Sequence, residues 1–284
     1  MNTDTDTSAT AGTRTGTSGT SGTSGTSGTR TGTSGTSGTR TGTSGTSGTS
    51  GTSGTRTGTS GTSGTSGTSA TTAAGLPALP ATPAARAALD LVLREETPAV
   101  AHHSIRSAVF ARLLADHRGA EAGRDYDPEL LFLACALHDI GLTVRGDGEQ
   151  RFEVDGADAA AEFLTGQGFA APQVDAVWQA IALHSSPGIA ERSGTLCAFV
   201  RLGVGLDFGH GADFIPDATG AALHAAYPRL SMATSLVDAI VGQAQRRPGK
   251  APRYSIAGEL LRERSEPPHR TALEVQTEAA RWGN

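Results

Sequence analysis

The stretch Asp127-Pro-Glu-Leu-Leu-Phe-Leu-Ala-Cys-Ala-Leu-His-Asp139 decides the fold class of this chain. Its eight consecutive apolar residues, Leu130–Leu137, follow an Asp-Pro pair, which is typical of a helix N-cap with proline in the first position. A helix that is apolar on all sides has no face for water. Residues Glu129–His138 are therefore predicted to form the central, buried helix of the domain.

The segments on both sides of this helix are also predicted to be helical. Their apolar residues recur at the three- and four-residue spacing of a helix with one buried face, and clusters of Gly, Pro and Asp separate them. The predicted helices are 84–95, 99–117, 155–166, 172–184, 193–203, 217–226 and 232–246. No stretch shows the two-residue alternation of a half-buried strand, so we expect an all-α fold.

The first 72 residues differ in composition from the rest. They consist almost wholly of a repeated Thr-Ser-Gly triplet and contain 18 of the 38 glycines but no Pro, His, Cys or aromatic residue. Such a segment has nothing to bury, so 1–72 is predicted to be a disordered, low-complexity tail. The expected organisation is then a linker over 73–83, a single helical domain over 84–265 and a C-terminal tail over 266–284.

Charge argues against a nucleic-acid partner, hydropathy argues against a membrane partner, and the cysteines bear on the compartment. Four arginines and two aspartates lie in the tail, which leaves 19 basic and 26 acidic residues and a formal charge of −7 on the remainder. An acidic domain is a poor match for a phosphate backbone, so we expect no nucleic-acid partner. Cys135 and Cys197 favour a reduced compartment. The run Leu130–Leu137 is too short to span a bilayer and no targeting segment is visible, so a cytoplasmic protein without a membrane partner is expected.

The pair His138-Asp139 at the end of the central helix is the first candidate site. An imidazole and a carboxylate are costly to bury without partners, and a metal ion is the most economical partner for both. Adjacent residues on a helix diverge by roughly 100°, so both reach one ion only at a terminus or a bend, which Gly141 permits. The alternative is a histidine near the helix dipole with the aspartate turned to solvent.

Two residues elsewhere in the chain complete a pattern. His103 lies on the helix predicted upstream, and Asp207 follows an apolar helical run downstream. The order His…His-Asp…Asp resembles the metal site of the HD-domain superfamily. That resemblance implies that His103, His138, Asp139 and Asp207 hold one divalent metal, with zinc favoured and Fe, Mn or Mg as alternatives.

The resemblance extends beyond the four ligands. The strings His103-Ser-Ile-Arg106, Leu137-His-Asp-Ile-Gly-Leu142, Ala182-Leu-His-Ser185, Gly203-Val-Gly-Leu-Asp207 and Tyr227-Pro-Arg-Leu230 occur in this order. Together they resemble the branch of HD proteins that contains the cyanamide hydratases, over roughly residues 85–260. The chain departs from that branch at His102, where a neutral amide is expected, and over Phe208–Ala212. These departures bear on the substrate and not on the metal.

His184 and Arg106 are the next candidates. His184 ends an apolar helix as His138 does, and the resemblance implies that it faces the substrate or a metal-bound water; the alternative is a structural histidine. It is the one histidine between Asp139 and Asp207, whereas the diiron HD oxygenases need two there, so a single metal is favoured. Arg106 lies one turn after His103 and either binds substrate or pairs with Asp139 or Asp207 from behind.

These residues predict a metal-dependent hydrolase or hydratase that activates water on a small molecule, for example a nitrile-like compound such as cyanamide. Asp139 or His184 would move the proton. One alternative is an HD phosphohydrolase acting on a phosphomonoester or nucleotide, and another is a non-catalytic HD module that binds a ligand. The sequence leaves the oligomeric state open, with a homo-oligomer as one option.

Because the tail has nothing to bury, we expect that deleting residues 1–72 leaves activity unchanged. The full-length and truncated proteins would be compared in the same turnover assay. Loss of activity in the truncated protein would show that the tail has a role.

Overall fold

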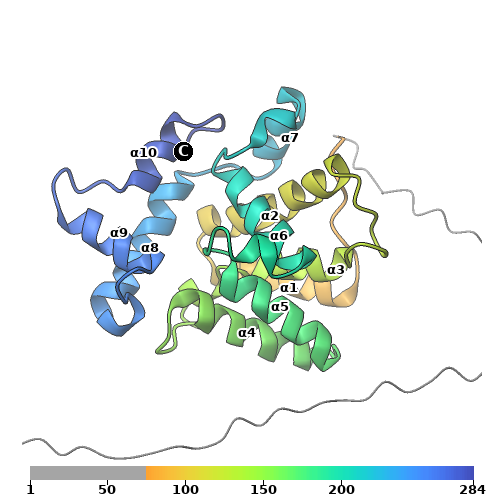
Figure 1. The fold of residues 1–284 in the computed structure, drawn as a ribbon, viewed down its shortest axis with the longest axis horizontal. Helices are drawn as coiled ribbons and strands as arrows, with labels where there is room; N and C mark the ends of the chain where they lie inside the picture. The colour runs from red at the N-terminus through yellow and green to blue at the C-terminus, as the bar shows by residue number, and fades with distance from the viewer. Residues whose placement is uncertain (1–74) are drawn as a thin grey trace, which may run out of the picture. The chain divides into compact units, whose positions relative to one another are not determined.

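The computed structural model describes residues 75–284, and the predicted disordered tail over 1–72 lies outside the described residues. Within this part the chain forms helices joined by loops and no β-strand, which confirms the all-α prediction (Figure 1). The helices are α1 (Pro83–Glu95), α2 (Pro98–His117), α3 (Pro128–Leu137), α4 (Phe152–Gly166), α5 (Ala171–Leu183), α6 (Thr195–Asp207), α7 (Asp217–Ala226), α8 (Met232–Arg246), α9 (Ile256–Ser265) and α10 (Ala272–Ala279). Short 3₁₀ turns are η1 (Ile140–Leu142), η2 (Ala190–Arg192), η3 (Ala212–Phe214) and η4 (Pro248–Lys250).

Helix α3 is the buried centre that its sequence predicts. The Asp127 side chain accepts hydrogen bonds from the amides of Glu129 (2.8 Å) and Leu130 (3.1 Å), with Pro128 in the first turn. Every residue from Leu130 to Leu137 is buried, and α1, α2, α5 and α6 all pack against this helix. The chain therefore leaves α3 at His138 in the interior of the domain.

Helices α2 and α6 make the most extensive contact between two helices in the described part of the chain, and a glycine permits it. A side chain at Gly203 would place its Cβ 2.6 Å from Cβ of Ala111 and 2.7 Å from the carbonyl oxygen of Ser107. Close approach of the two backbones thus requires the absence of a side chain there. It brings His103 on α2 opposite Asp207 at the end of α6.

A second glycine fixes the turn after α3. The Cβ of any residue in place of Gly141 would lie 2.0 Å from the carbonyl oxygen of Phe152 and 2.7 Å from the amide of Gly156. Turn η1 thus lies directly against the first turn of α4. The tight packing, as well as the bend expected from the sequence, explains the glycine after the His-Asp pair.

Helices α8, α9 and α10 gather at the left of the view in Figure 1, beside α4, α5 and α6 at the centre and bottom. They enclose a second apolar cluster that includes Leu236, Ile240 and Leu260, and that reaches Phe152 on α4 and Phe208 after α6. The larger cluster surrounds α3. The end of α3 therefore lies where the two apolar clusters approach each other.

The segment 266–284, expected from the sequence to be a tail, differs in the structure. It contains α10, which begins with a capping box between Thr271 and Glu274. The Trp282 ring stacks on Phe110 with centroids 5.7 Å apart, and its Nε1 donates to the carbonyl of Leu206 at 2.7 Å. This end of the chain is packed against α2 and α6.

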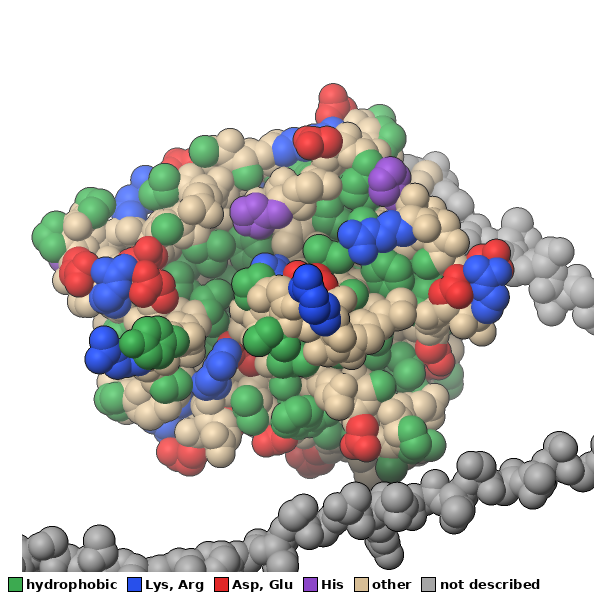
Figure 2. Space-filling view, viewed as in Figure 1, with side chains coloured by type: hydrophobic (Ala, Val, Ile, Leu, Met, Phe, Trp, Pro, Cys, Tyr) green, Lys and Arg blue, Asp and Glu red, His purple; other side chains and the backbone are tan. Residues whose placement is uncertain are grey.

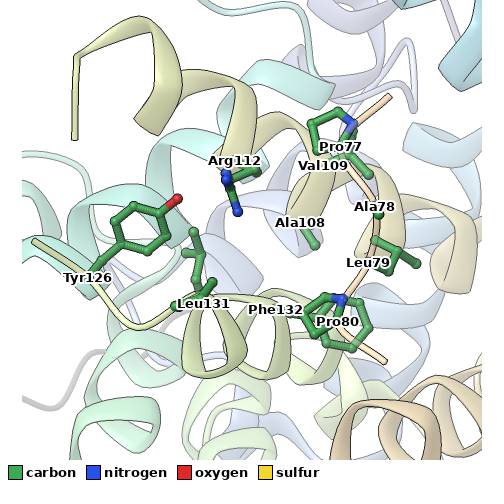
Figure 3. Close-up of a pocket in the computed structure, with 11 residues that line it drawn as sticks. Pro77, Ala78, Leu79, Pro80, Ala108, Val109, Arg112, Tyr126, Leu131 and Phe132 are labelled. Carbon is green, nitrogen blue, oxygen red and sulfur yellow. The ribbon is translucent and has the colours of Figure 1, made fainter. Parts of the chain in front are cut away.

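Residues before α1 also pack on the domain. Leu76 is buried, and Figure 3 shows Pro77–Pro80 running past Ala108 and Val109 of α2 and over Phe132 of α3. The cavity between them measures ≈ 30 Å³. It is mostly apolar and contains no His, Cys, Asp or Glu, so it has no donors for a metal ion. In the described part of the chain, no helix is long and apolar enough to cross a membrane.

The chain's one lysine ties the loop before α4 to the end of α8. Lys250 is 2% exposed, and its Nζ donates to Asp155 Oδ2 (2.5 Å), Asp147 Oδ1 (2.9 Å) and the carbonyl of Gly148 (3.1 Å). Arg247 donates to the carbonyls of Asp147 and Gly148 as well. Removing the ammonium would leave the buried Asp155 carboxylate without its cation.

We therefore expect Lys250→Met to lower the free energy of unfolding by about 3 kcal/mol, the cost of an uncompensated buried charge. Urea unfolding followed by circular dichroism measures it. Arg262→Met is the control, because Arg262 pairs with Glu259 and Glu266 at the exposed surface, and it should leave the midpoint nearly unchanged. Equal midpoints for the Lys250 variant and the wild type would show that this buried pair adds nothing.

Candidate metal centre

His138 follows the last residue of α3 and points one ring nitrogen at its own helix. Its Nδ1 lies 2.7 Å from the carbonyl oxygen of Cys135. A carbonyl only accepts hydrogen bonds, so Nδ1 carries the proton and Nε2 of the neutral ring carries a lone pair. The end of α3 therefore presents a metal-ligating nitrogen to the interior.

His184 repeats this geometry at the end of α5. Its Nδ1 donates to the carbonyl of Ile181 at 2.7 Å, again three residues upstream, and the ring is 5% exposed. The rings of His138 and His184 lie with centroids 4.8 Å apart. Nε2 of His184 approaches Oδ1 of Asp139 to 3.8 Å. The structure thus places His184, which the resemblance led us to expect facing the substrate or a metal-bound water, beside the His-Asp pair.

His103 reaches the same point from α2. Its Nδ1 donates to Oδ2 of Asp207 at 2.6 Å, which leaves the Nε2 lone pair directed at Asp139, 3.8 Å from Oδ2. The Phe208 ring packs edge-on against the His103 ring at 5.2 Å. A hydrogen bond on one side and an aromatic ring on the other thus fix the orientation of the imidazole.

Three buried atoms at this point have no hydrogen-bond partner: Nε2 of His103, Nε2 of His138 and Oδ2 of Asp139. The ligand atoms offered by these residues lie within 4.8 Å of one another. Two ligands about 2.1 Å from one tetrahedral ion lie roughly 3.4 Å apart, and the structure has 3.2 Å from His138 and 3.8 Å from His103 to Asp139. The orphaned atoms and their spacing fit a divalent metal ion held by two imidazoles and a carboxylate.

The protonation of these groups follows from burial and mutual contacts. Burial disfavours the charged form of Asp139, but His138, His103 and His184 outweigh it and hold the pKa of Asp139 well below its usual range. Burial lowers the pKa of His103, and it lowers the pKa of His184 to about 4. For His138, Asp139 and the Cys135 carbonyl outweigh burial and raise the pKa. A divalent ion requires the carboxylate ionised and both ligating imidazoles neutral, so its binding would displace the proton that Asp139 favours on His138.

Asp207, the fourth ligand expected from the resemblance, lies behind His103. Its Oδ2 accepts from His103 and from Nη2 of Arg106 (2.8 Å), and its Oδ1 accepts from Nε of Arg106 (2.7 Å) and Nη1 of Arg229 (3.1 Å). Both oxygens are thus occupied by donors. In this arrangement Asp207 orients His103 and raises the basicity of its Nε2.

Arg106 does not line the cavity beside the metal site. Its guanidinium is fully buried against Asp207, and its Nη1 donates to the carbonyls of Tyr227 (3.0 Å) and Pro228 (3.1 Å). Of the two roles left open by the sequence, substrate binding and pairing with a carboxylate, the structure shows the pairing. Each of the three nitrogens of the Arg106 guanidinium donates to a protein oxygen.

A cavity of ≈ 110 Å³ adjoins the three ligands. Its polar lining consists of the site residues with Ser185, Arg201 and His210, and the rest of its lining is Phe152, Val204, Gly205, Phe208, Leu236, Ile240, Ile256 and Leu273. Figure 2 shows a hollow with many hydrophobic side chains on the face where α8, α9 and α10 meet α4 and α6. Drug-sized ligands occupy roughly 300–1,000 Å³, so this cavity suits a molecule of only a few non-hydrogen atoms.

Sequence reasoning missed a hydrogen-bonded group of three residues beside His184: Arg151, Glu153 and Ser185. Glu153 is fully buried on α4, and it accepts from Ser185 Oγ (2.5 Å) and from Arg151. Arg151 and Ser185 outweigh burial and lower the pKa of Glu153. Ser185 gives its proton to an ionised carboxylate and accepts a long hydrogen bond from Nη2 of Arg151 (3.5 Å), so one lone pair of Oγ is left to accept from a molecule in the cavity. The string Ala182–Ser185 was a signal for Ser185, but nothing in the sequence connects it to Glu153.

The other histidines and Cys135 lie outside the ligand group. His102 bonds the Pro228 carbonyl (2.9 Å), His117 stacks on Phe214, and His210 lines the cavity. Cys135 is fully buried in the core, and burial raises the pKa of its thiol. A thiol in that state is a packing group and not a metal ligand.

The fold and these side chains describe a helical domain with a candidate metal site, and comparison identifies the kind of domain. Residues 100–239 match the model of the HD domain, so this part of the chain is an HD domain. The matched range includes all four residues of the expected ligand set. It ends within α8, so α9 and α10 lie beyond the family match.

Two cyanamide hydratases of Saccharomyces cerevisiae, DDI2 and DDI3, are similar to this chain. Each is 28% identical over 167 residues, which cover 57% of this chain and 73% of the yeast protein. The resemblance to this branch, inferred from the five sequence strings, is thereby confirmed.

We expect the purified chain to bind one divalent metal ion and the His138→Ala variant to bind none, because the variant loses the Nε2 ligand. Asp207→Asn should retain the ion with an affinity about 10- to 100-fold weaker, the usual effect of removing a partner of a ligating histidine. Metal content and titration with zinc measure both, with circular dichroism to check folding. A folded Asp207→Asn protein as free of metal as His138→Ala would place Asp207 among the ligands.

Proposed function

We propose that this protein is a metal-dependent hydratase that adds water to a small nitrile-like substrate such as cyanamide. The observation that carries the proposal is the set of three orphaned ligand atoms of His103, His138 and Asp139 beside a cavity of ≈ 110 Å³. A divalent ion bound there lowers the pKa of water toward neutrality and polarises an electrophile. We propose zinc as the ion, with Fe, Mn or Mg as alternatives for these donors.

His184 is the proposed proton-transfer residue. Burial lowers the pKa of its imidazole to about 4, so the ring is neutral near pH 7 and its Nε2 is free to accept a proton. The Nδ1 bond to Ile181 fixes the tautomer in which Nε2 is the base. Asp139, the second candidate, offers Oδ2 to the ion, and its Oδ1 faces His184 at 3.8 Å, which orients the base.

For cyanamide the chemistry balances as the addition of one water. The water oxygen forms a bond to the nitrile carbon, His184 takes the proton released, and the same imidazole returns it to the substrate nitrogen. Tautomerisation of the adduct gives urea. Ser185 Oγ, whose proton is held by Glu153, accepts from an N–H group of the substrate or product. An acceptor at this place suits an amide-like product better than an ester.

The size of the cavity argues against the alternative of a nucleotide phosphohydrolase. A nucleotide needs a site several times larger than ≈ 110 Å³. The cavity also contains a single arginine and no lysine, whereas phosphate recognition recruits several cations. A purely ligand-binding module is disfavoured by the free Nε2 of a buried, neutral His184 directly beside the ligand group.

We further propose a reducing, cytoplasmic setting, supported by the free thiols Cys135 and Cys197.

The zinc-loaded protein is expected to convert cyanamide to urea, and His184→Ala should lower kcat by about 10²- to 10⁴-fold, the usual contribution of a general base. Metal content should remain at one ion per chain in this variant, since His184 is not among the three ligands.

Urea release, phosphate release from a phosphomonoester and bound metal would be measured on the same preparations. Phosphate release without urea would favour the phosphohydrolase. A His184→Ala protein that has lost its metal would make His184 a ligand and remove it as the base.

A further inference from the structure

Arg201 lies on the wall of the cavity, on the face of α6 that continues to the metal site. Arg201, Val204, Gly205 and Phe208 follow the three- and four-residue spacing of one helix face, and all four line the cavity. Phe208, at the far end of this row, packs on the ring of His103. The row therefore runs from the metal ligands to Arg201 over seven residues, a rise of about 10 Å.

The guanidinium extends back along this row toward the metal site. Its Nη1 would lie 3.3 Å from a Cβ placed on Gly205, and the Cβ of His210 would lie at 4.0 Å. The space left by the missing side chain of Gly205 is thus the space that the guanidinium uses. The charge of Arg201 therefore lies beside Gly205, the residue one helical turn nearer the ligands along α6.

Arg201 has no acid partner among the described residues. Its Nε is buried without a hydrogen-bond partner, and no ion pair joins it to a carboxylate within residues 75–284. The two other arginines buried near the site, Arg106 and Arg229, both donate to Asp207. A half-buried guanidinium with an unsatisfied donor is costly unless a ligand supplies the acceptor.

The charges around the cavity specify that ligand. Asp139 is the one acidic residue of the lining, and it faces the three histidines. With a divalent ion bound, the cavity has a positive centre at one end and Arg201 at the other, between apolar walls that strengthen both fields. The planar guanidinium fork matches a carboxylate in geometry. One cation in so small a space fits a singly charged group better than a phosphate dianion.

We propose that Arg201 binds a carboxylate of the substrate, so that the cavity selects small molecules with the reactive carbon at the metal end and a carboxylate at the other. The part concerning the reactive carbon rests on the proposed function. The part concerning the carboxylate rests on Arg201 alone. Cyanamide, which is neutral, would then be a substrate that leaves Arg201 without a partner.

Calorimetric titration of the zinc-loaded full chain tests the proposal, with propionate and propionamide as probes. The two molecules have nearly the same shape and differ in charge, and neither has a nitrile, so the measurement needs no turnover. We expect propionate to bind at least about tenfold more tightly than propionamide. Arg201→Gln should reduce this preference to less than about twofold, and Arg201→Lys should retain part of it, because the charge stays and the fork is lost.

Arg118→Gln is the matched control, since Arg118 is exposed and lies outside the cavity lining, and it should keep the full preference. Thermal unfolding checks that the variants fold; Arg201 has no partner to lose, so its melting temperature should change little. A preference that persists in Arg201→Gln would mean that the carboxylate binds at the metal, and equal affinities in the wild type would mean that the cavity does not select charge. Either result overturns the inference, whereas a failure to hydrate cyanamide overturns only the proposed function.

Discussion

The hydrogen bond from His103 to Asp207 is the contact on which the rest of the site depends. It joins α2 to the end of α6. Because His103 and Asp207 are both fully buried, the other polar atoms of the two side chains also need hydrogen-bond partners from the protein or a ligand. Arg106 and Arg229 supply those donors to Asp207, and the carbonyls of Tyr227 and Pro228 in turn accept from Arg106. The network holds one imidazole in a single tautomer and orientation. The network forms because α2 and α6 pack closely at Gly203.

The other two histidines are fixed by a simpler and more local device. In both His138 and His184 the ring follows the last residue of a helix and donates Nδ1–H to the carbonyl three residues upstream. That carbonyl is one of those a helix end leaves without an intrahelical partner. The bond therefore satisfies the helix end and sets the tautomer at once, and no other residue is needed. Only His103, in the middle of α2, requires a carboxylate for the same purpose.

The sequence predicts the parts of the site that depend on local pattern. An apolar run after Asp-Pro predicts α3 and, with it, the position of His138 and Asp139. It does not show on which side of His103 the Asp207 carboxylate lies, because a carboxylate that ligates an ion and one that orients its histidine have the same residue type and spacing. Arg106 was undecided for the same reason: its partner is 101 residues away in the chain.

The helices after residue 246 escaped prediction for a different reason. In α10 the buried residues are Glu274 and Thr277, which form part of the helix cap and bond to the preceding turn, so no apolar stripe marks the helix. In α9 the buried positions are only Ala257 and Leu260, among charged neighbours. Tertiary contacts decide both helices. Their position matters to the site because Ile256 and Leu273 close one wall of the cavity.

The residues proposed for reactivity and those proposed for selectivity therefore lie in separate parts of the chain. The ligand atoms of His103, His138 and Asp139 are held by α2 and α3 and their partners, within the range that matches the HD domain. The cavity is closed by α8, α9 and α10, and its unpaired charge is on α6. Asp207 is neutralised by two arginines, so it does not offset Arg201, and the apolar walls keep the field of that guanidinium unscreened. Under the two proposals, a change confined to the α6 face, such as a substitution of Arg201, alters which molecule is bound while the groups proposed to activate water stay in place.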